Sequence, residues 1–399
     1  MTVQHVREAL GTWDINLDAT TPRRILDLLD LDVYGYSHLV ITPLHIDTNV
    51  LTGTGLLDLA RYTGVYRKNN LASRREGEPV QIEGVHLAVL LGDEEGKGDN
   101  FAVGVDITNR PFRDASNTSY ITAVLSRGNG LTTGSVDSAA SPSRTGRVNA
   151  GDTARQLLDY ACSTFSKEWR VNPNGTLDAA AKATIYPTTV TPTVAFLPED
   201  GGRDGAITGI EANVYRLDSD VEDYSSAVTV RATSTNALGS ASIGVNPYVG
   251  WSGAALTIRR AIDSQLAFST TSADNVAATQ LGRFDETRRH VRITTSIYDV
   301  ENFVGPGDGI FVFDPDQDLY DLTRQVFYRG RIIFPLIMRV EAIRWPVQQG
   351  MGVYLRYWTG STFAFLDLTD WVLWEDRDAE LDIGDIYRTL GSPRRRLNV

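Results

Sequence analysis

Cysteine is nearly absent from this chain of 399 residues, which contains only Cys162. One thiol excludes a disulfide within the chain and a metal site built from several cysteines. Cys162 falls on the apolar face of a predicted helix, which favours a buried structural thiol. Histidine is also scarce, and the histidines lack the spacing of metal ligands on a helix. They are His5, His38, His45, His86 and His290.

Long apolar runs are missing too. No run approaches the roughly 18–20 residues that a helix needs to cross a bilayer. Residues 1–17 lack the apolar centre of a signal peptide. We therefore expect the chain to fold in a cytoplasm, or to leave it by another route.

Basic charge is in deficit, because 38 Lys and Arg residues face 50 Asp and Glu residues, for a net charge of −12. Phosphate contacts dominate the affinity of proteins for nucleic acids, so this balance speaks against tight DNA binding. It is compatible with a surface that DNA slides past. The basic run Arg394–Arg396 is weak support for nucleic-acid binding and predicts an exposed tail or a contact with an acidic partner.

Motifs that carry catalysis are also missing. The chain has no G-x-S-x-G nucleophile elbow and no P-loop. Gly305–Gly309 lacks the helix and the lysine that follow in a phosphate-binding loop, so it predicts a turn. The segment Asp314–Asp318 resembles the start of a calcium loop. Leu319 and Gln325 stand where such a loop needs a glycine and a bidentate glutamate, which favours an Asp/Pro turn.

Carboxylates are plentiful, and sequence alone leaves open whether two of them face each other across a sugar-binding cleft. Acidic runs are more often solvated surface than catalytic pairs. The acidic groups considered are Asp93, Glu94, Glu95, Asp218, Asp220, Glu222 and Asp223.

What the sequence does have is a clear helix and hairpin between residues 152 and 179. Asp152 is a predicted N-cap, and Leu157, Leu158, Ala161, Cys162 and Phe165 recur at helical spacing. The Asn-Gly turn at 172–175 connects two short predicted strands, because it tolerates the positive φ that a tight hairpin needs. The unit contains no catalytic constellation.

Most of the remaining pattern is β. The hydrophobic content of 42% is typical of a globular protein, and 399 residues are too many for one ordinary core, so we expect two to four domains. We expect a brief helix or an extended segment at 21–31, a short helix or turn at 53–64, a helix at 275–281, and an exposed loop or linker at 127–151. Strands are predicted at 39–41, 80–91, 101–108, 121–125, 255–263 and 290–300 and through 326–376. The second and third of these should form a hairpin, and 214–234 should contain a strand pair.

Aromatic residues crowd the end of the chain. Core packing explains most of them, and a sugar platform or a subunit interface would use the same residue types. They are Trp345, Tyr354, Tyr357, Trp358, Trp371 and Trp374.

Several segments together resemble the tail-hub type of minor tail protein from long-tailed phages (siphoviruses) of actinobacteria, which is related to the baseplate hub of contractile tails. The resemblance covers roughly residues 150–375 and is weaker over the first 150. The segments that carry it are residues 152–179, 191–204, 220–230, 307–321, 329–335 and 344–358.

The resemblance implies a mainly β fold with an α+β insertion. It implies a first tube-type β-barrel with long loops at 1–150, a helix-hairpin unit at 151–205, a second barrel at 206–304, and a C-terminal β module and tail at 305–399. Either barrel can be discontinuous in sequence. No catalytic, cofactor-binding or metal-binding residue carries over from the family.

The family's role is structural. Such hubs are homotrimers at the tail tip of the virion, assembled in the bacterial host cytoplasm, where they adapt a six-fold tail tube to a three-fold tip. Implied partners are the distal tail protein or tail tube, the tape-measure protein, a central fibre or spike and other minor tail proteins. DNA would be passing cargo, and no stable membrane insertion is implied.

Two alternatives stay open. The chain could be a tail-associated hydrolase of cell-wall glycan or peptide, or a carbohydrate-binding receptor protein that uses the C-terminal aromatic residues.

Overall fold

The computed structural model describes most of the chain. The described residues are 2–6, 10–29, 37–46, 55–70, 75, 77–92, 105–106, 112–113, 119–127, 130–137, 147–165, 167–199, 201–217, 225–233, 235–242, 252–254, 257–264, 267, 269–281, 290–295, 304–347, 350–372 and 379–385. The molecule is mainly β, as predicted, and no helix in these segments is long and apolar enough to cross a membrane.

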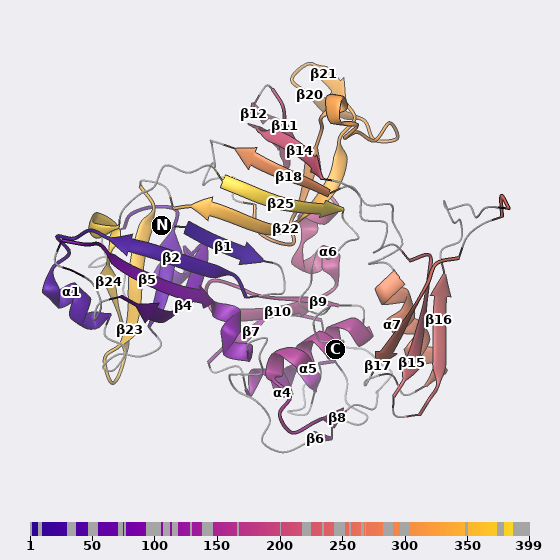
Figure 1. Cartoon of the computed structure of the whole chain (residues 1–399), viewed down its shortest axis with the longest axis horizontal. Coiled ribbons are helices and arrows are strands. Elements are labelled where there is room, and N and C mark those ends of the chain that lie inside the picture. Colours follow the sequence, from indigo (N-terminus) through magenta and orange to yellow (C-terminus); the bar gives the residue numbers. More distant parts are fainter. Residues whose placement is uncertain are drawn as a thin grey trace.

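One sheet of 15 strands forms the frame (Figure 1). Its main path runs β12-β13-β11-β19-β22-β1-β2-β5-β4-β3-β23-β24, and β14, β18 and β25 branch from β22. The strands are β1 (Thr2–Val6), β2 (Thr12–Leu17), β3 (His38–Thr42), β4 (Tyr62–Asn69), β5 (Val80–His86), β11 (Val194–Leu197), β12 (Gly202–Asp204), β13 (Ile207–Glu211), β14 (Asn213–Leu217), β18 (His290–Thr295), β19 (Gly309–Val312), β22 (Leu336–Pro346), β23 (Gly352–Trp358), β24 (Phe363–Asp367) and β25 (Ala379–Asp385).

The long strand β22 joins the two arms of this sheet. One edge pairs with β25 along most of its length. The other edge pairs with β19 over its first half and with β1 over its second half. Strands from both ends of the chain therefore share one hydrogen-bonded frame, and β23 likewise lies between β3 and β24.

Neither of the two expected closed barrels is found among the described residues. In one arm the strands pair in the order β13-β11-β19-β22-β25-β18-β14. The first and last of these strands are consecutive in sequence, with only Ala212 between them. They do not pair with each other in the described structure, so this ring of strands stays open. In the other arm an isolated bridge joins Val372 to Leu17 at the end of β2. Both arms curl, and buried apolar residues of both arms form one continuous cluster.

A helical unit with its own core covers part of the frame. It contains α4 (Tyr120–Leu125) and α5 (Ala154–Phe165), the 3-10 helix η1 (Leu87–Leu91) and a small sheet. That sheet is β7 (Thr132–Val136), β10 (Thr176–Ala180) and β9 (Glu168–Val171), and the remaining pair is β6 (Val105–Asp106) with β8 (Arg147–Val148). β7 pairs with β10 across the boundary expected near residue 150.

The predicted helix and hairpin are confirmed, with a different cap. Thr153 is the N-cap of α5: its hydroxyl accepts from the Gln156 amide at 3.1 Å, and the Gln156 side chain accepts from the Thr153 amide at 2.8 Å. This reciprocal pair is a capping box. Asp152 instead accepts from the Asn149 amide. Gly175 ends the hairpin turn at φ +85°.

Two strand predictions were wrong. The apolar run Leu87–Leu91 is a buried 3-10 helix, because the side chain of His86 accepts from the Ala88 amide and ends the strand there. The segment 121–125 is a helix capped by Ser119, whose hydroxyl accepts from the Thr122 amide. In both places a side-chain cap outweighs the β preference of branched apolar residues.

Two pairing predictions were also wrong. β5 pairs with β2 and β4, and the described part of 101–108 pairs with β8. β14 pairs with β18, whereas β15 (Ala227–Ala232) pairs with β16 (Leu238–Ser242) and β17 (Arg259–Ser264). The latter sheet packs on α7 (Thr270–Leu281) and lies to the right of the frame (Figure 1). α7 confirms and extends the helix predicted at 275–281.

Shorter elements complete the fold. Helices α1 (Arg23–Leu28) and α3 (Gly55–Asp58) lie within the first two predicted helical segments. The others are α6 (Lys182–Ile185), η2 (Pro187–Thr189), η5 (Pro315–Gln317), η6 (Thr369–Trp371) and the hairpin β20 (Val326–Tyr328) with β21 (Arg331–Ile333).

Candidate functional site

The chemical candidates that fall within the described residues do not converge on one site. Cys162 is 1% exposed in the core around α5, as predicted. Asp314 accepts from the Asp316 amide at 3.1 Å and Asp318 takes a left-handed φ of +57°, which confirms an Asp/Pro turn. No group of three potential metal ligands occurs in the described ranges.

Other candidates lie outside the described residues. They are the acidic groups Asp93, Glu94, Glu95, Asp218, Asp220, Glu222 and Asp223, the basic run Arg394–Arg396, and Trp374.

A shallow open hollow on the face of β2, β4 and β5 does bring two carboxylates together. Asp14 and Glu83 are direct cross-strand partners on that face. Lys68 pairs with Glu83 at 2.8 Å, and both side chains are more than half exposed. The general acid of such a pair is held in an enclosed, apolar environment, whereas Glu83 is more than half exposed and paired with a surface lysine. The hollow therefore lacks the environment of a glycosidase pair.

A buried ion pair joins the helical unit to the frame. Arg339 in β22 contacts Glu168 in β9 through both terminal nitrogens, and its Nη1 lies 2.8 Å from Oε1. The Arg339 side chain is 3% exposed and that of Glu168 is 14% exposed. Arg339 Nε also donates to the Gly307 carbonyl at 2.9 Å. We call these residues, with Tyr186 and Asp308, the joint.

The ring of Tyr186 contacts one arginine from β22 and one from β9. The guanidinium carbons of Arg339 and Arg170 are 4.9 and 5.2 Å from the centre of its ring, which places two cations on an aromatic face. Arg170 is held in turn by Asp178 at 2.9 Å. The joint thus connects β22 with β9, and the Arg170–Asp178 pair links it to β10.

The turn Gly305–Gly309 makes room for this contact. A Cβ at Gly307 would lie 2.3 Å from the Tyr186 ring, and one at Gly309 would lie 2.4 Å from the Thr188 carbonyl. Burial raises the pKa of the Asp308 carboxyl, which accepts from the Gly305 amide and the Thr188 hydroxyl. The sequence predicted a turn here. Its glycines indicated that another part of the chain could pack closely against this turn, but they did not indicate that Tyr186 and Thr188 would be the residues that do so.

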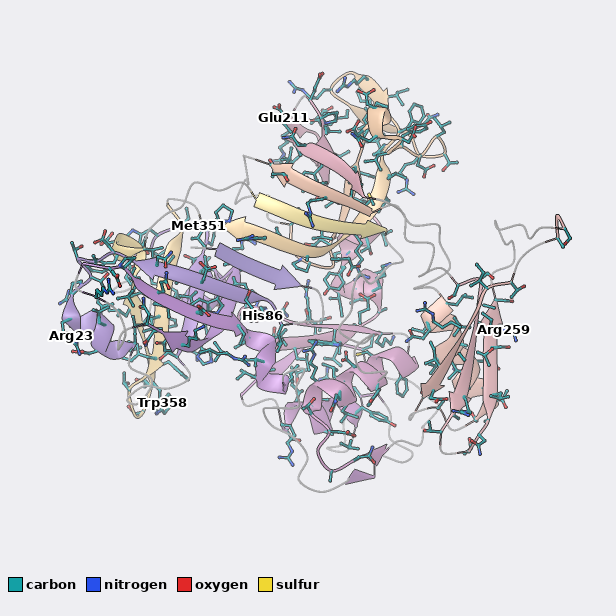
Figure 2. The ribbon with its side chains drawn as sticks, viewed as in Figure 1. Arg23, His86, Glu211, Arg259, Met351 and Trp358 are labelled. Atoms are coloured by element: carbon teal, nitrogen blue, oxygen red, sulfur yellow. The ribbon has the colours of Figure 1, made fainter. Side chains whose placement is uncertain are left out.

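The aromatic residues near the C-terminus divide into two groups. Tyr354 is buried under α3, and Trp371 packs against the main core. Trp358 is 51% exposed and Phe363 is 40% exposed, with ring centres 4.9 Å apart. Trp358 lies at the tip of the β23–β24 hairpin, far from the helical unit (Figure 2).

Arg356 and His38 complete this tip. The guanidinium carbon of Arg356 is 3.7 Å from the centre of the Phe363 ring. Two nitrogens here are buried and have no hydrogen-bond partner among the described residues. They are Nε of Arg356 and Nδ1 of His38. Burial, and secondarily the charge of Arg356, lowers the pKa of His38 to about 4.

His38 gives a pH prediction. Its pKa is about 4 in the folded chain against an ordinary value of 6.5, so between these values the unfolded chain binds the extra proton. We expect the free energy of unfolding to fall by up to about 3 kcal/mol as the pH drops from 7 to 4. Urea unfolding of the wild type and His38→Gln across this range measures it. The variant should lose that slope, and parallel pH profiles for the two proteins would refute the assignment.

Comparison with known proteins finds a likeness in fold. No protein-family model and no curated protein matches the sequence. Among solved structures, a tail protein from Neisseria meningitidis MC58 is similar at 15% identity and a TM-score of 0.51, covering 96% of each chain. A 43 kDa tail protein of prophage MuSo2 from Shewanella oneidensis has 11% identity and a TM-score of 0.49, covering 96% of this chain and 92% of that one.

Proposed function

We propose that this chain is a structural protein of a phage tail, which acts as a trimeric hub at the tail tip. One observation carries the proposal: the fold matches that of the Neisseria tail protein over 96% of both chains. A likeness that runs from end to end concerns the whole architecture, including the frame and the helical unit. At 15% identity it is a likeness of fold, and the function is our inference from it.

The form of the frame supports a tube-wall role. Its two curled arms, joined at β22 and β1, offer two β modules per copy. Three copies with two modules each would present six modules to a six-fold tube. The net charge of −12 would repel DNA phosphates along the path and let the genome pass. The distal tail protein, the tape-measure protein and a central fibre or spike would be its neighbours.

The joint supports the same role. The modules of a hub must stay attached to one another when force acts on the tail. Arg339, Glu168 and Tyr186 fix the helical unit to the long strand β22 through buried contacts. We infer that the chain works through assembly and shape, and that it belongs to the virion.

Disruption of the gene in the phage tests this function. We expect particles that lack complete tails, and restoration of tails when the gene is supplied on a plasmid. Intact, fully tailed particles from the disrupted phage would contradict the proposal.

Zymography separates the hub from the hydrolase alternative. Purified protein should produce no clearing band in a gel that contains cell walls of the host. A clearing band from the purified chain would favour the hydrolase.

A further inference from the structure

The two ends of the large sheet are protected very differently. At the β12 end, Tyr328 donates its hydroxyl to the Gly202 carbonyl at 2.7 Å. Arg329 donates to the Gly201 carbonyl at 2.8 Å, and its backbone amide contacts the Asp204 carboxylate. The β20–β21 hairpin therefore covers this end.

At the other end, β24 pairs with β23 and no further strand joins it in the part of the chain that the structure describes. Its sequence, Phe-Ala-Phe-Leu-Asp, has no proline, lysine or arginine. Proteins usually protect an edge strand with such residues, with a bulge or with a cover, because a free edge invites pairing with another chain. Among the described residues, the outer edge of β24 is therefore unpaired, and it has no charged or proline guard along Phe363–Leu366.

A cation without an acidic partner lies beside this edge. Arg356 forms no ion pair among the described residues, and burial lowers its pKa. Its neighbour His38, directly opposite on β3, is neutral at physiological pH and supplies no negative charge. A half-buried guanidinium of this kind is stabilised most by a carboxylate, which it can bind through two nitrogens.

Exposed aromatic side chains stand over the same end of the hairpin. Trp358 and Phe363 are direct cross-strand partners, so they lie on one face together with Arg356. Trp and Arg at a partly open surface are the residue types that dominate the binding energy of protein interfaces.

We propose that the β24 edge is a contact between copies of this chain, where an extended segment of a second copy runs beside Phe363–Asp367 and places a carboxylate on Arg356. This inference rests on the trimeric hub proposed above, and it assigns that assembly a surface. Trp358 and Phe363 would pack against the incoming segment. The chain has an excess of 12 acidic residues, so its own surface is a source of the missing carboxylate.

The geometry favours a head-to-tail contact with a different surface of the neighbour. Self-pairing of two β24 edges would supply only Asp367, which already contacts His45 Nε2 at 2.6 Å and accepts from the Thr369 amide at 2.8 Å. A head-to-tail contact that closes after three copies gives a ring, as a hub requires. A glycan on Trp358 would leave the backbone edge of β24 uncovered, so we favour a polypeptide.

The test uses the full-length chain in native mass spectrometry and sedimentation velocity. We expect Arg356→Glu, and separately Trp358→Ala, to weaken self-association at least tenfold. Phe327→Ala is the matched control, because Phe327 is an exposed aromatic residue (69%) on the β20–β21 hairpin, away from the free edge. The control should associate like the wild type. Hydrogen exchange at Phe363–Asp367 should be slow in the oligomer and faster in Arg356→Glu.

The outcomes separate this inference from the proposed function. If the wild type is a trimer and both edge variants are equally stable trimers, the β24 contact is refuted and the hub survives. If the wild type stays monomeric at tens of micromolar, both fail. If Trp358→Ala abolishes binding to isolated host cell walls and leaves the trimer intact, the tip of the β23–β24 hairpin binds glycan and not a second copy, and the inference is overturned.

Discussion

Replacing Arg339 by methionine is expected to lower the free energy of unfolding by about 3–5 kcal/mol, because it leaves the carboxylate of Glu168 buried without its counter-charge. The pair is almost fully enclosed, and Arg339 also donates to the Gly307 carbonyl. Urea unfolding followed by tryptophan fluorescence measures the change. The helical unit should exchange its amide hydrogens faster than the frame in the variant, since the joint connects the two.

A matched control exists within the same chain. Arg231 and Asp263 form a similar two-nitrogen pair at 2.8 and 2.9 Å, with both side chains more than half exposed. Arg231→Met should change stability little, because exposed ion pairs contribute little. The double variant Arg339→Met/Glu168→Leu should recover much of the loss. Equal effects of Arg339→Met and Arg231→Met would refute the role of the joint.

Gly84→Ala is expected to destabilise the frame by about 3 kcal/mol, because the site has no room for a methyl group. A Cβ there would lie 2.3 Å from the Trp13 indole and 2.3 Å from the Val65 carbonyl oxygen. Trp13 lies across β5 and donates its Nε1 hydrogen to the Val85 carbonyl at 3.2 Å. Since the Val65 contact is with backbone, a smaller residue at position 13 should fail to rescue the variant.

Gly201→Ala is the control for this substitution. Its Cβ would meet the nearest atom at 3.2 Å, and its φ is not in the left-handed region. We expect a much smaller change in the midpoint of thermal unfolding for Gly201→Ala than for Gly84→Ala. If Gly84→Ala unfolds at the wild-type temperature, the packing of Trp13 described above is wrong.

Local structure was predicted best where one segment carries all of its signals. Helix α5 and the hairpin that follows it contain their own apolar face and Asn-Gly turn within 30 residues or so. The capping residue was misassigned by one position, because Asp152 and Thr153 are both good caps and only Thr153 has glutamine three residues on. Where an apolar run was short, as at Leu87–Leu91, periodicity could not distinguish strand from helix.

Long-range pairing was beyond the sequence for a physical reason. Strand β1 pairs with β22, and β3 pairs with β23. Alternation of apolar and polar residues is common to all half-buried strands, so it does not identify which strand pairs with which. The joint shows the same limit, because Arg339 and Glu168 are 171 residues apart. Arg356 and Trp358 were readable as a strand with aromatic residues, but the free edge beside them depends on which strand ends the sheet.

Reconstruction of the tail tip of the virion by electron cryomicroscopy would show directly whether this chain is a trimeric hub. We expect three copies of this fold around the tail axis, arranged as a collar that continues the tube, with the β24 edge of each copy against the next. A tail tip without density for this fold, or with the chain present as isolated single copies, would contradict this expectation.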